Sequence, residues 1–365
     1  MRKCYIDLAF WAVLLSAVLL GCRRESLPVA DDAIKFSVGQ SVTFSGLQTK
    51  TGDETVELPD DESYLKTQGN KIRIWGDYKI EGENNPWVSI FEGTRATYTA
   101  TGDWDYWGEG NPKYWDKNAE YRFRAVFPDT AEILDESGSG QLNISYSMRE
   151  KEVNSQTVRS DYDLMVASAP SVDGATQLSS GDPVTLKFRH ACAAVRFFFK
   201  DPSVKESGGA PVYNYYIKSF ELQHLYTDGT LIYNGNSSND EVKIQEWHTA
   251  GLRMESVFEW TGNWAVPKEY TAPKGWFFVI PQALNVDETD HTAIKFTYTF
   301  GASGAEIPEI LTIDTNKVGD VLQDVTWLPG QLYTYYIQIQ PTSSIVSVEV
   351  EDWDDYEVWV KEIIF

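Results

Sequence analysis

The side chains best suited to catalysis or metal binding in this sequence are its four histidines. His190, His224, His248 and His291 are scattered, and none stands at a spacing such as H-E-x-x-H that would bring two imidazoles to one metal ion. No G-x-S-x-G turn, phosphate-binding glycine loop or Cys–His spacing indicates a nucleophile. The sequence therefore predicts no catalytic residue, no metal site and no cofactor, and it favours a protein that is not an enzyme.

Carboxylates offer two further kinds of chemistry. Asp and Glu number 54, yet no spacing nominates a pair for glycoside hydrolysis, so a hydrolase ranks last among the alternatives. Asp103–Asp105, followed by Gly108 and Glu109, and Asp352–Asp355 loosely resemble a calcium loop. Neither fits the full twelve-residue pattern, so solvated turns are the favoured interpretation.

Tryptophans in a turn-rich region form the one candidate ligand site. Trp87, Trp104, Trp107 and Trp115 lie in a stretch rich in Gly, Asp and Asn. Aromatic rings in loops can form a platform for a sugar or a partner protein, whereas in strands they belong to the core. Trp104 and Trp107 are the candidate platform, and they support an alternative function as a surface glycan-binding lipoprotein with a host or bacterial ligand.

Composition limits the class of protein. The 365 residues carry a net charge of −23, which argues against nucleic acid as a partner, because phosphate binding needs clustered Lys and Arg. The length favours two domains. Of three cysteines, two lie within the first 22 residues, so Cys192 stands alone in the folded part. Its apolar surroundings predict a buried, unreactive thiol, and His190 beside it is expected to be a hydrogen-bonded structural histidine.

The N-terminus has the layout of an export signal. Arg2 and Lys3 precede an apolar run over 8–20 that is too short to span a bilayer. Residues 1–21 are therefore predicted to be a signal peptide. The run ends in Gly21–Cys22, which resembles the lipobox of bacterial lipoproteins; that resemblance implies cleavage after Gly21 and a covalent lipid on Cys22 that binds the membrane. Residues 22–32 would form a tether. The alternative is an ordinary signal peptide with a chance cysteine.

The rest of the chain alternates polar and apolar residues with a period of two, which is typical of strands with one buried face. No stretch shows sustained helical periodicity. The sequence predicts an all-β fold of two tandem β-sandwiches: an N-terminal one over 33–168, a linker over 169–182 rich in Ser, Gly and Asp, and a C-terminal one over 183–365. Asp228–Gly229 between apolar runs predicts a hairpin turn.

One strand-forming stretch, residues 183–200, changes its pattern midway. Its apolar residues fall on even positions before Arg189 and on odd positions from Ala191 onward. A flat strand would then swap its inward side chains to the other face, so the chain must bulge or turn at Arg189–His190.

Several motifs, in order, resemble the fimbrillin family of Bacteroidetes fimbriae and cover most of the chain after the lipobox. They are YRFRAVFP over 121–128, DLMVA over 163–167, VTLKFRHACAAV over 184–195, FFVIPQ over 277–282, LPGQLYTYYIQI over 328–339 and VSVEVEDW over 346–353. The resemblance implies two transthyretin-like β-sandwiches, partnership with other fimbrial subunits, and a place on the outer membrane or in a fimbrium at the cell surface.

The resemblance also implies assembly by β-strand addition, in which a protease removes the first strand and another subunit's C-terminal strand fills the groove. The candidate cleavage residues are Lys50 and Arg73. The candidate leaving strand carries Ile34, Phe36, Val38, Val42 and Phe44, and the candidate donor strand carries Val358, Val360, Ile363 and Phe365. The donor segment could equally be the last strand of its own sheet.

Overall fold

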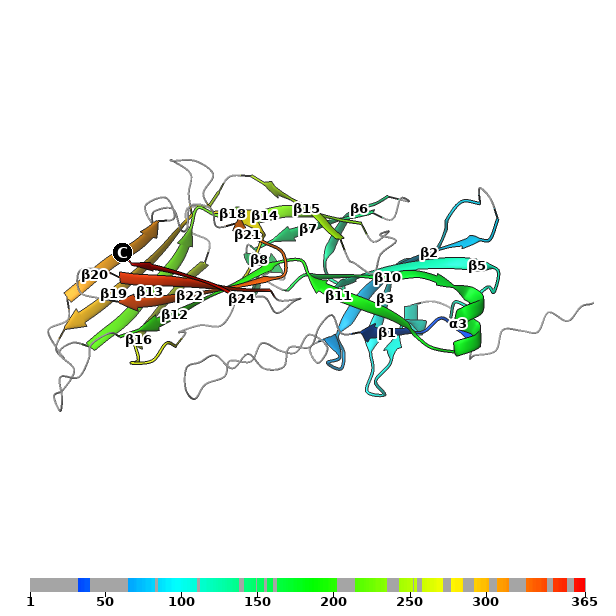
Figure 1. Ribbon diagram of the computed structural model, residues 1–365, viewed down its shortest axis with the longest axis horizontal. Coiled ribbons are helices and arrows are strands. Elements are labelled where there is room, and N and C mark those ends of the chain that lie inside the picture. The colour runs from blue at the N-terminus through cyan, green and yellow to red at the C-terminus, as the bar shows by residue number, and fades with distance from the viewer. Residues whose placement is uncertain are drawn as a thin grey trace, which may run out of the picture.

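The computed structural model describes residues 32–39, 65–82, 85–109, 112–137, 141–148, 150–153, 156–159, 163–201, 214–234, 243–251, 253–254, 258–271, 277–284, 292–301, 307–314, 326–339, 344–352 and 358–364. Strands predominate among them, which confirms the all-β prediction. The molecule is elongated, with its sheets arranged one after another along the long axis (Figure 1).

A seven-stranded sheet occupies one end of the molecule, in the order β1-β11-β10-β5-β2-β3-β4. Its strands are β1 (Phe36–Gly39), β2 (Lys71–Ile80), β3 (Val88–Tyr98), β4 (Trp104–Asp105), β5 (Ala119–Phe127), β10 (Met165–Asp173) and β11 (Val184–His190). The alternation in β5 explains how the sheet packs: Tyr121 and Phe123 point into a first core on one face, and Val126 points into a second core on the other.

Two strands from distant parts of the chain meet in the four-stranded sheet β15-β14-β7-β6. Its members are β6 (Glu132–Ser137), β7 (Gln141–Ser147), β14 (Asp228–Asn234) and β15 (Lys243–Ala250), and β8 (Glu150–Val153) and β9 (Gln156–Arg159) form a separate hairpin. Strand β7 pairs antiparallel with β14, with Ile144 opposite Leu231. Both side chains are fully buried in the second core.

Two further sheets form the opposite end of the molecule (Figure 1). One is β17-β12-β22-β23-β24 and the other is β16-β13-β19-β20. Their strands, with the short pair β18 and β21, are β12 (Ala193–Lys200), β13 (Asn214–Gln223), β16 (Phe258–Ala265), β17 (Phe277–Val279), β18 (Gln282–Ala283), β19 (Ala293–Gly301), β20 (Ile307–Asp314), β21 (Thr326–Trp327), β22 (Gln331–Ile339), β23 (Ser344–Asp352) and β24 (Val358–Ile364). Aromatic rings join the two sheets, such as Phe199 against Phe296 with centroids 5.4 Å apart.

The predicted pattern break coincides with the passage of the chain from one sheet to another. The strand ends at His190 in β11 and resumes at Ala193 in β12, which belongs to a different sheet. The even set, Val184 to Phe188, is buried in the first core, and the odd set, Ala191 to Phe199, is buried in the second. The inward side chains therefore do not swap faces within one sheet.

The sheets do not follow the predicted division of the chain. Residues 169–173 of the expected linker complete β10, and 174–180 form the helix α3 (Gly174–Ser180). The Asp173 carboxylate accepts the Thr176 N–H at 2.7 Å, and Gly181 ends the helix with φ 69°. Strand β11, expected to open the C-terminal sandwich, pairs with β10. The second core draws its residues from Trp75 to Ile339 along the chain, so it contains residues of both predicted sandwiches.

The hairpin predicted at Asp228–Gly229 is wrong. Asp228 already belongs to β14, which pairs with β7 and β15, whereas the preceding strand β13 pairs with β16 and β19. The chain crosses between sheets here, and a close turn would have kept both strands in one sheet.

Candidate functional site

The first strand, β1, lies at an edge of the seven-stranded sheet. Among the described residues it pairs in parallel with β11 only, with Phe36 opposite Val184, and Ala33 just before it forms an isolated antiparallel bridge with Tyr114. Of the predicted inward residues, Ile34, Phe36 and Val38 are buried in the first core. The other two, at positions 42 and 44, lie outside the described residues. The strand is thus bonded to its sheet along one side while its side chains fill the core.

Phe36 is the centre of an aromatic cluster in this core. Its ring meets Phe91, Tyr106 and Phe123 edge to face, with centroids 5.4, 6.0 and 5.3 Å away. Such edge-to-face pairs contribute about 0.5–1.5 kcal/mol each beyond the burial of their area. The cluster is the main side-chain contact that holds β1 in place.

Besides the ladder with β11, main-chain and side-chain bonds hold the residues just before β1. The Ile34 N–H donates to the Lys113 carbonyl at 2.8 Å, and the Tyr106 hydroxyl donates to the Ile34 carbonyl at 2.8 Å. Burial raises the pKa of Tyr106, so this hydroxyl keeps its proton at neutral pH. The bond therefore remains available as a donor under ordinary conditions.

A cavity of about 690 Å³ lies beside β1. One wall is residues 34–38, and the opposite wall is residues 98–107, which include β4 and the short 3₁₀ helix η2 (Trp107–Glu109). The seven-stranded sheet has β1 and β4 as its two edges, so the cavity separates the two open edges of a single sheet.

The two candidate platform tryptophans both line this cavity but differ in exposure. Trp104 is 5% exposed and packs against Tyr98, with ring centroids 5.3 Å apart. Trp107, in η2, is 47% exposed. The pair therefore does not present two open rings: Trp104 supports the wall and Trp107 stands at the surface. Ligand binding by these residues stays a prediction.

The C-terminal candidate strand, β24, is also an edge strand. Among the strands that the structure describes it pairs antiparallel with β23 only, with Val360 opposite Glu349 and Ile363 opposite Val346. Val358 begins the strand, and position 365 lies outside the described residues. In this single chain β24 is thus the last strand of its own sheet.

The predicted processing residues have different surroundings. Arg73 is half-buried within β2, which is hydrogen-bonded to β3 on one side and β5 on the other. A protease needs an extended, accessible segment, so this position does not suit cleavage. Lys50 lies outside the described residues, as do Cys22, the signal peptide and most of the tether.

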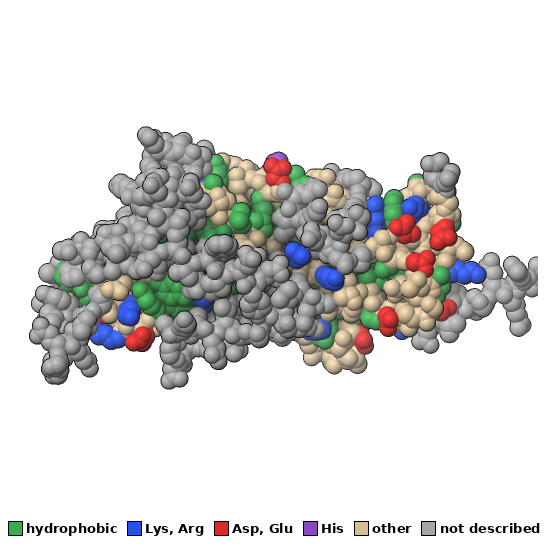
Figure 2. Space-filling view, viewed as in Figure 1, with side chains coloured by type: hydrophobic (Ala, Val, Ile, Leu, Met, Phe, Trp, Pro, Cys, Tyr) green, Lys and Arg blue, Asp and Glu red, His purple; other side chains and the backbone are tan. Residues whose placement is uncertain are grey.

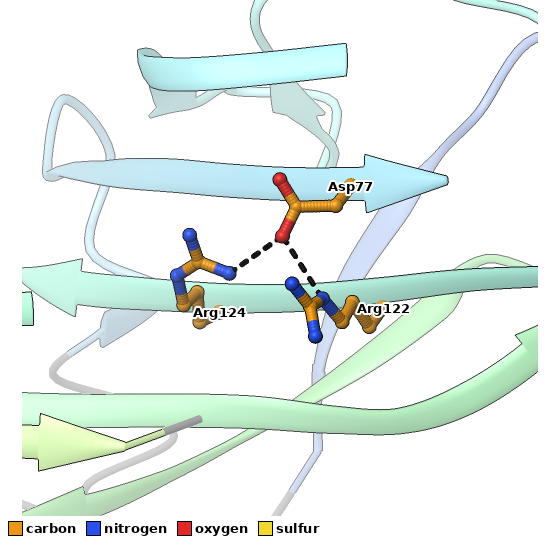
Figure 3. Close-up of polar contacts among 3 residues, drawn as sticks. All are labelled: Asp77, Arg122 and Arg124. Atoms are coloured by element: carbon orange, nitrogen blue, oxygen red, sulfur yellow. Dashed lines mark hydrogen bonds and ion pairs between the residues drawn. The ribbon is translucent and has the colours of Figure 1, made fainter. Parts of the chain in front are cut away.

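Sequence reasoning missed a buried charge cluster on the second-core face of the seven-stranded sheet. The Asp77 carboxylate on β2 accepts hydrogen bonds from Arg122 Nε and Arg124 Nη1 on β5, each at 2.9 Å (Figure 3). The Arg122 guanidinium also lies 4.3 Å from the centroid of the Trp87 ring. The alternation of arginine with aromatic residues in β5 was the available signal. The contacts join neighbouring strands, so the cluster has a structural role.

A buried pair of a histidine and an aspartate lies at the junction between β11 and β12. His190 Nδ1 lies 2.8 Å from Asp163 Oδ2, and both side chains are buried. Cys192 is fully buried, as predicted, and burial raises its pKa to about 12, with the Asp163 charge as a smaller cause. Such a thiol is protonated and unreactive at neutral pH.

The remaining candidates for chemistry do not converge. His248 is exposed and pairs with Glu246 at 3.1 Å, and His224 lies in a backbone turn with φ 57°. Among the described residues, no three His, Cys, Asp or Glu side chains are grouped closely enough to hold a metal ion. On the face shown in Figure 2, several of the described acidic side chains lie at the surface of the end that carries α3. No helix in the described part is long and apolar enough to cross a membrane.

The fold is that of a large β-sandwich protein. Its first and last described strands, β1 and β24, both lie at sheet edges. The chain matches the model of the fimbrillin-like family over residues 60–353, and it belongs to this family. A comparison with curated proteins gave no match.

Solved structures with a similar chain path come from Bacteroidetes. One, from Bacteroides uniformis and assigned to cell adhesion, is 19% identical, with 88% of this chain and 98% of that chain covered and a TM-score of 0.46. The fimbrial anchor protein Mfa2 of Porphyromonas gingivalis is 11% identical, with 81% and 91% covered and a TM-score of 0.30. A fimbrial assembly protein of Parabacteroides distasonis is 10% identical, with 81% and 92% covered and a TM-score of 0.31. These scores are low, and the family assignment rests on the family model.

Proposed function

We propose that this chain is a non-enzymatic subunit of cell-surface fimbriae, exported as a lipoprotein, that joins other subunits through β-strand addition. The observation that carries the proposal is the position of β1. The strand and the residue two before it fill the first core with Ile34, Phe36 and Val38, yet in the described part of the chain β1 shares a ladder with β11 only. A strand held in this way leaves an apolar groove when it is removed.

Main-chain bonds decide whether such a groove is refilled, because apolar burial and the cost of ordering the strand are of similar size. Three buried side chains contribute about 1.5–3 kcal/mol each, and ordering a strand costs about 1–2 kcal/mol per residue. An empty groove therefore exposes apolar area that an incoming strand with the same alternation can cover, while main-chain bonds to β11 set its register. The seated strand must leave first, so β1 acts as the block to assembly.

The donor would be the segment that contains β24. It is a terminal edge strand with one neighbour, so its release breaks a single ladder, the one with β23. Cleavage after Lys50 would free β1 while leaving β2 and the rest of the sheet intact. The lipid on Cys22 would hold the unprocessed subunit at the outer membrane.

The test is a reversible disulfide bond between β1 and β11. The Ser37 Oγ and Thr185 Oγ1 atoms lie 3.2 Å apart on paired positions of β1 and β11. The double variant Ser37→Cys/Thr185→Cys should form a disulfide there, because the two side chains already face each other at close range. We expect the oxidised variant to remain monomeric after protease treatment and the reduced variant to form concentration-dependent ladders on gels.

The single variant Ser37→Cys is the matched control, since it can form no such bond with the buried Cys192. Mass spectrometry of the polymers should find an N-terminus downstream of β1, and deletion of residues 356–365 should abolish the ladders. Polymers from the oxidised double variant, or polymers whose subunits all begin at Cys22, would falsify assembly by replacement of β1.

A further inference from the structure

We infer that the cavity between β1 and residues 98–107 is a binding site for a neutral saccharide, with Trp107 as the stacking surface and Asp103 and Asp105 as acceptors for sugar hydroxyls. The inference does not rest on the fimbrial proposal, because it concerns the molecule with β1 in place.

The segment 103–107 presents alternate side chains to opposite sides. Trp104 and Tyr106 are buried in the first core, whereas Asp103, Asp105 and Trp107 are exposed and line the cavity. Trp107 is the one aromatic side chain classed as exposed among those the structure describes. An indole ring beside two carboxylates combines an apolar face, which covers the C–H face of a sugar ring, with strong acceptors for its hydroxyl groups.

Local hydrogen bonds fix these groups before any ligand arrives. The Thr99 N–H donates to the Asp103 carbonyl at 2.9 Å, and the Asp103 N–H donates to Thr99 Oγ1 at 3.2 Å. Asp105 Oδ1 accepts the Trp107 N–H at 2.8 Å, so one carboxylate both holds the turn of η2 and faces the cavity. A rigid arrangement loses little conformational entropy when it binds a ligand.

Size and charge select the class of ligand. A volume of about 690 Å³ lies within the usual range for small-molecule sites. Lys35 and Lys66 line the cavity along with Asp103 and Asp105, so the charged side chains at the cavity cancel. A neutral ligand with many hydroxyls fits this balance better than a phosphate, a sialic acid or a basic peptide.

The experiment uses the mature chain and an array of neutral and charged glycans, followed by calorimetric titration of the tightest neutral hit. We expect the wild type to bind neutral saccharides, Trp107→Ala to weaken that binding about tenfold, and Trp107→Phe to retain most of it. Asp103→Asn should weaken it less, because the amide keeps one acceptor oxygen. The matched control is Leu328→Ala, since Leu328 is also exposed, at 52%, and lies away from this cavity.

Three results would each overturn the inference. They are no saccharide binding by the wild type, equal binding by the wild type and Trp107→Ala, and tighter binding of charged than of neutral glycans. Capture at this cavity of a peptide with the sequence of β24, insensitive to Trp107→Ala, would instead assign it to strand addition at the free edge of β1. Thermal unfolding of each variant confirms that it is folded. The ladder assay tests β-strand addition separately, so its result does not depend on any of these outcomes.

Discussion

The Tyr106 hydroxyl donates a hydrogen bond to the backbone carbonyl of Ile34 at 2.8 Å, although the two residues are 72 positions apart in the sequence. The same hydroxyl accepts the Lys113 N–H at 3.3 Å. One side chain thus connects the beginning of β1 to the segment that walls the neighbouring cavity. Stability of the first strand and geometry of the cavity are therefore linked through Tyr106.

Replacing Tyr106 with Phe should loosen β1 without emptying the core. The ring and its contacts with Phe36 and Phe91 remain, but the Ile34 carbonyl loses its buried partner. We expect a loss of about 1–3 kcal/mol in the free energy of unfolding, because a buried acceptor is left unsatisfied. Hydrogen exchange of the β1 amides should also become faster than in the wild type, while exchange of the β5 amides should stay unchanged. Unchanged protection of β1 would show that the bond does not hold the strand.

Phe36→Ala should be more destabilising. It removes the ring that meets three others and leaves a cavity, so we expect a loss of about 3–5 kcal/mol, measured by urea unfolding. The neighbouring Lys35→Ala is the control, since Lys35 is exposed and should change stability by less than about 0.5 kcal/mol. Equal effects of the two variants would mean that β1 does not occupy the core.

Asp77→Ala should destabilise the seven-stranded sheet through charge. The substitution leaves Arg122 and Arg124 largely buried without the carboxylate that bonds both. Breaking a buried ion pair at one partner costs about 3–5 kcal/mol, whereas Glu120→Ala removes a half-exposed pair with Lys79 and should cost about 1 kcal/mol or less. Urea unfolding of the two variants checks the difference, and similar losses would contradict a desolvated cluster.

Alkaline pH should destabilise the folded chain through the buried thiol of Cys192. Burial raises the pKa of Cys192 to about 12, so the folded chain keeps a proton that the unfolded chain releases above about pH 8.5. The contribution of the protonated Cys192 thiol to the free energy of unfolding is then fully present below that pH. It is lost as the pH rises toward the folded pKa, by about 1.4 kcal/mol per pH unit. Between pH 8.5 and 10 the wild type should lose about 2 kcal/mol more than Cys192→Ala in urea unfolding.

Buried tyrosines such as Tyr333, whose pKa burial raises to about 12, add the same alkaline loss to both proteins and cancel in that comparison. Equal losses in the two proteins would mean that Cys192 ionises freely in the folded state. The thiol should also react with a chromogenic disulfide reagent only after the chain unfolds.

Local patterns in the sequence were sufficient for many of the strands and for a break in the strand at Arg189–His190, whereas the change of sheet at that break was not predicted. Period-two alternation depends on neighbouring residues, and the switch from even to odd positions requires a change of buried face. The burial of Phe36 followed from the same pattern, and that of Cys192 from its small, apolar neighbours.

Pairing between distant strands could not be predicted in this way. Nothing in 141–147 indicates that it bonds to 228–234, because both strands only need a covered face and a free edge. The domain division based on composition missed this pairing. The Asp228–Gly229 signal failed for a related reason: tertiary contacts with β7 outweighed a local turn preference.

The candidate site was predicted only in part. Aromatic residues in a turn-rich stretch directed attention to Trp104 and Trp107, but their different exposure depends on which side of β4 faces the first core. Asp77 accepts hydrogen bonds from both Arg122 and Arg124 because of the register between β2 and β5, and no local pattern specifies that register.

The passage of β11 into β12 has a mechanical consequence. Only Ala191 and Cys192 separate the two strands, and backbone bonds from Ala191 N–H to the Leu164 carbonyl and from Gly330 N–H to the Cys192 carbonyl fix that joint. Strand β11 pairs in parallel with β1, and β12 pairs in parallel with β22. Tension along this continuous segment would load each ladder in shear, with its hydrogen bonds strained together, so the junction resists stretching better than a flexible hinge.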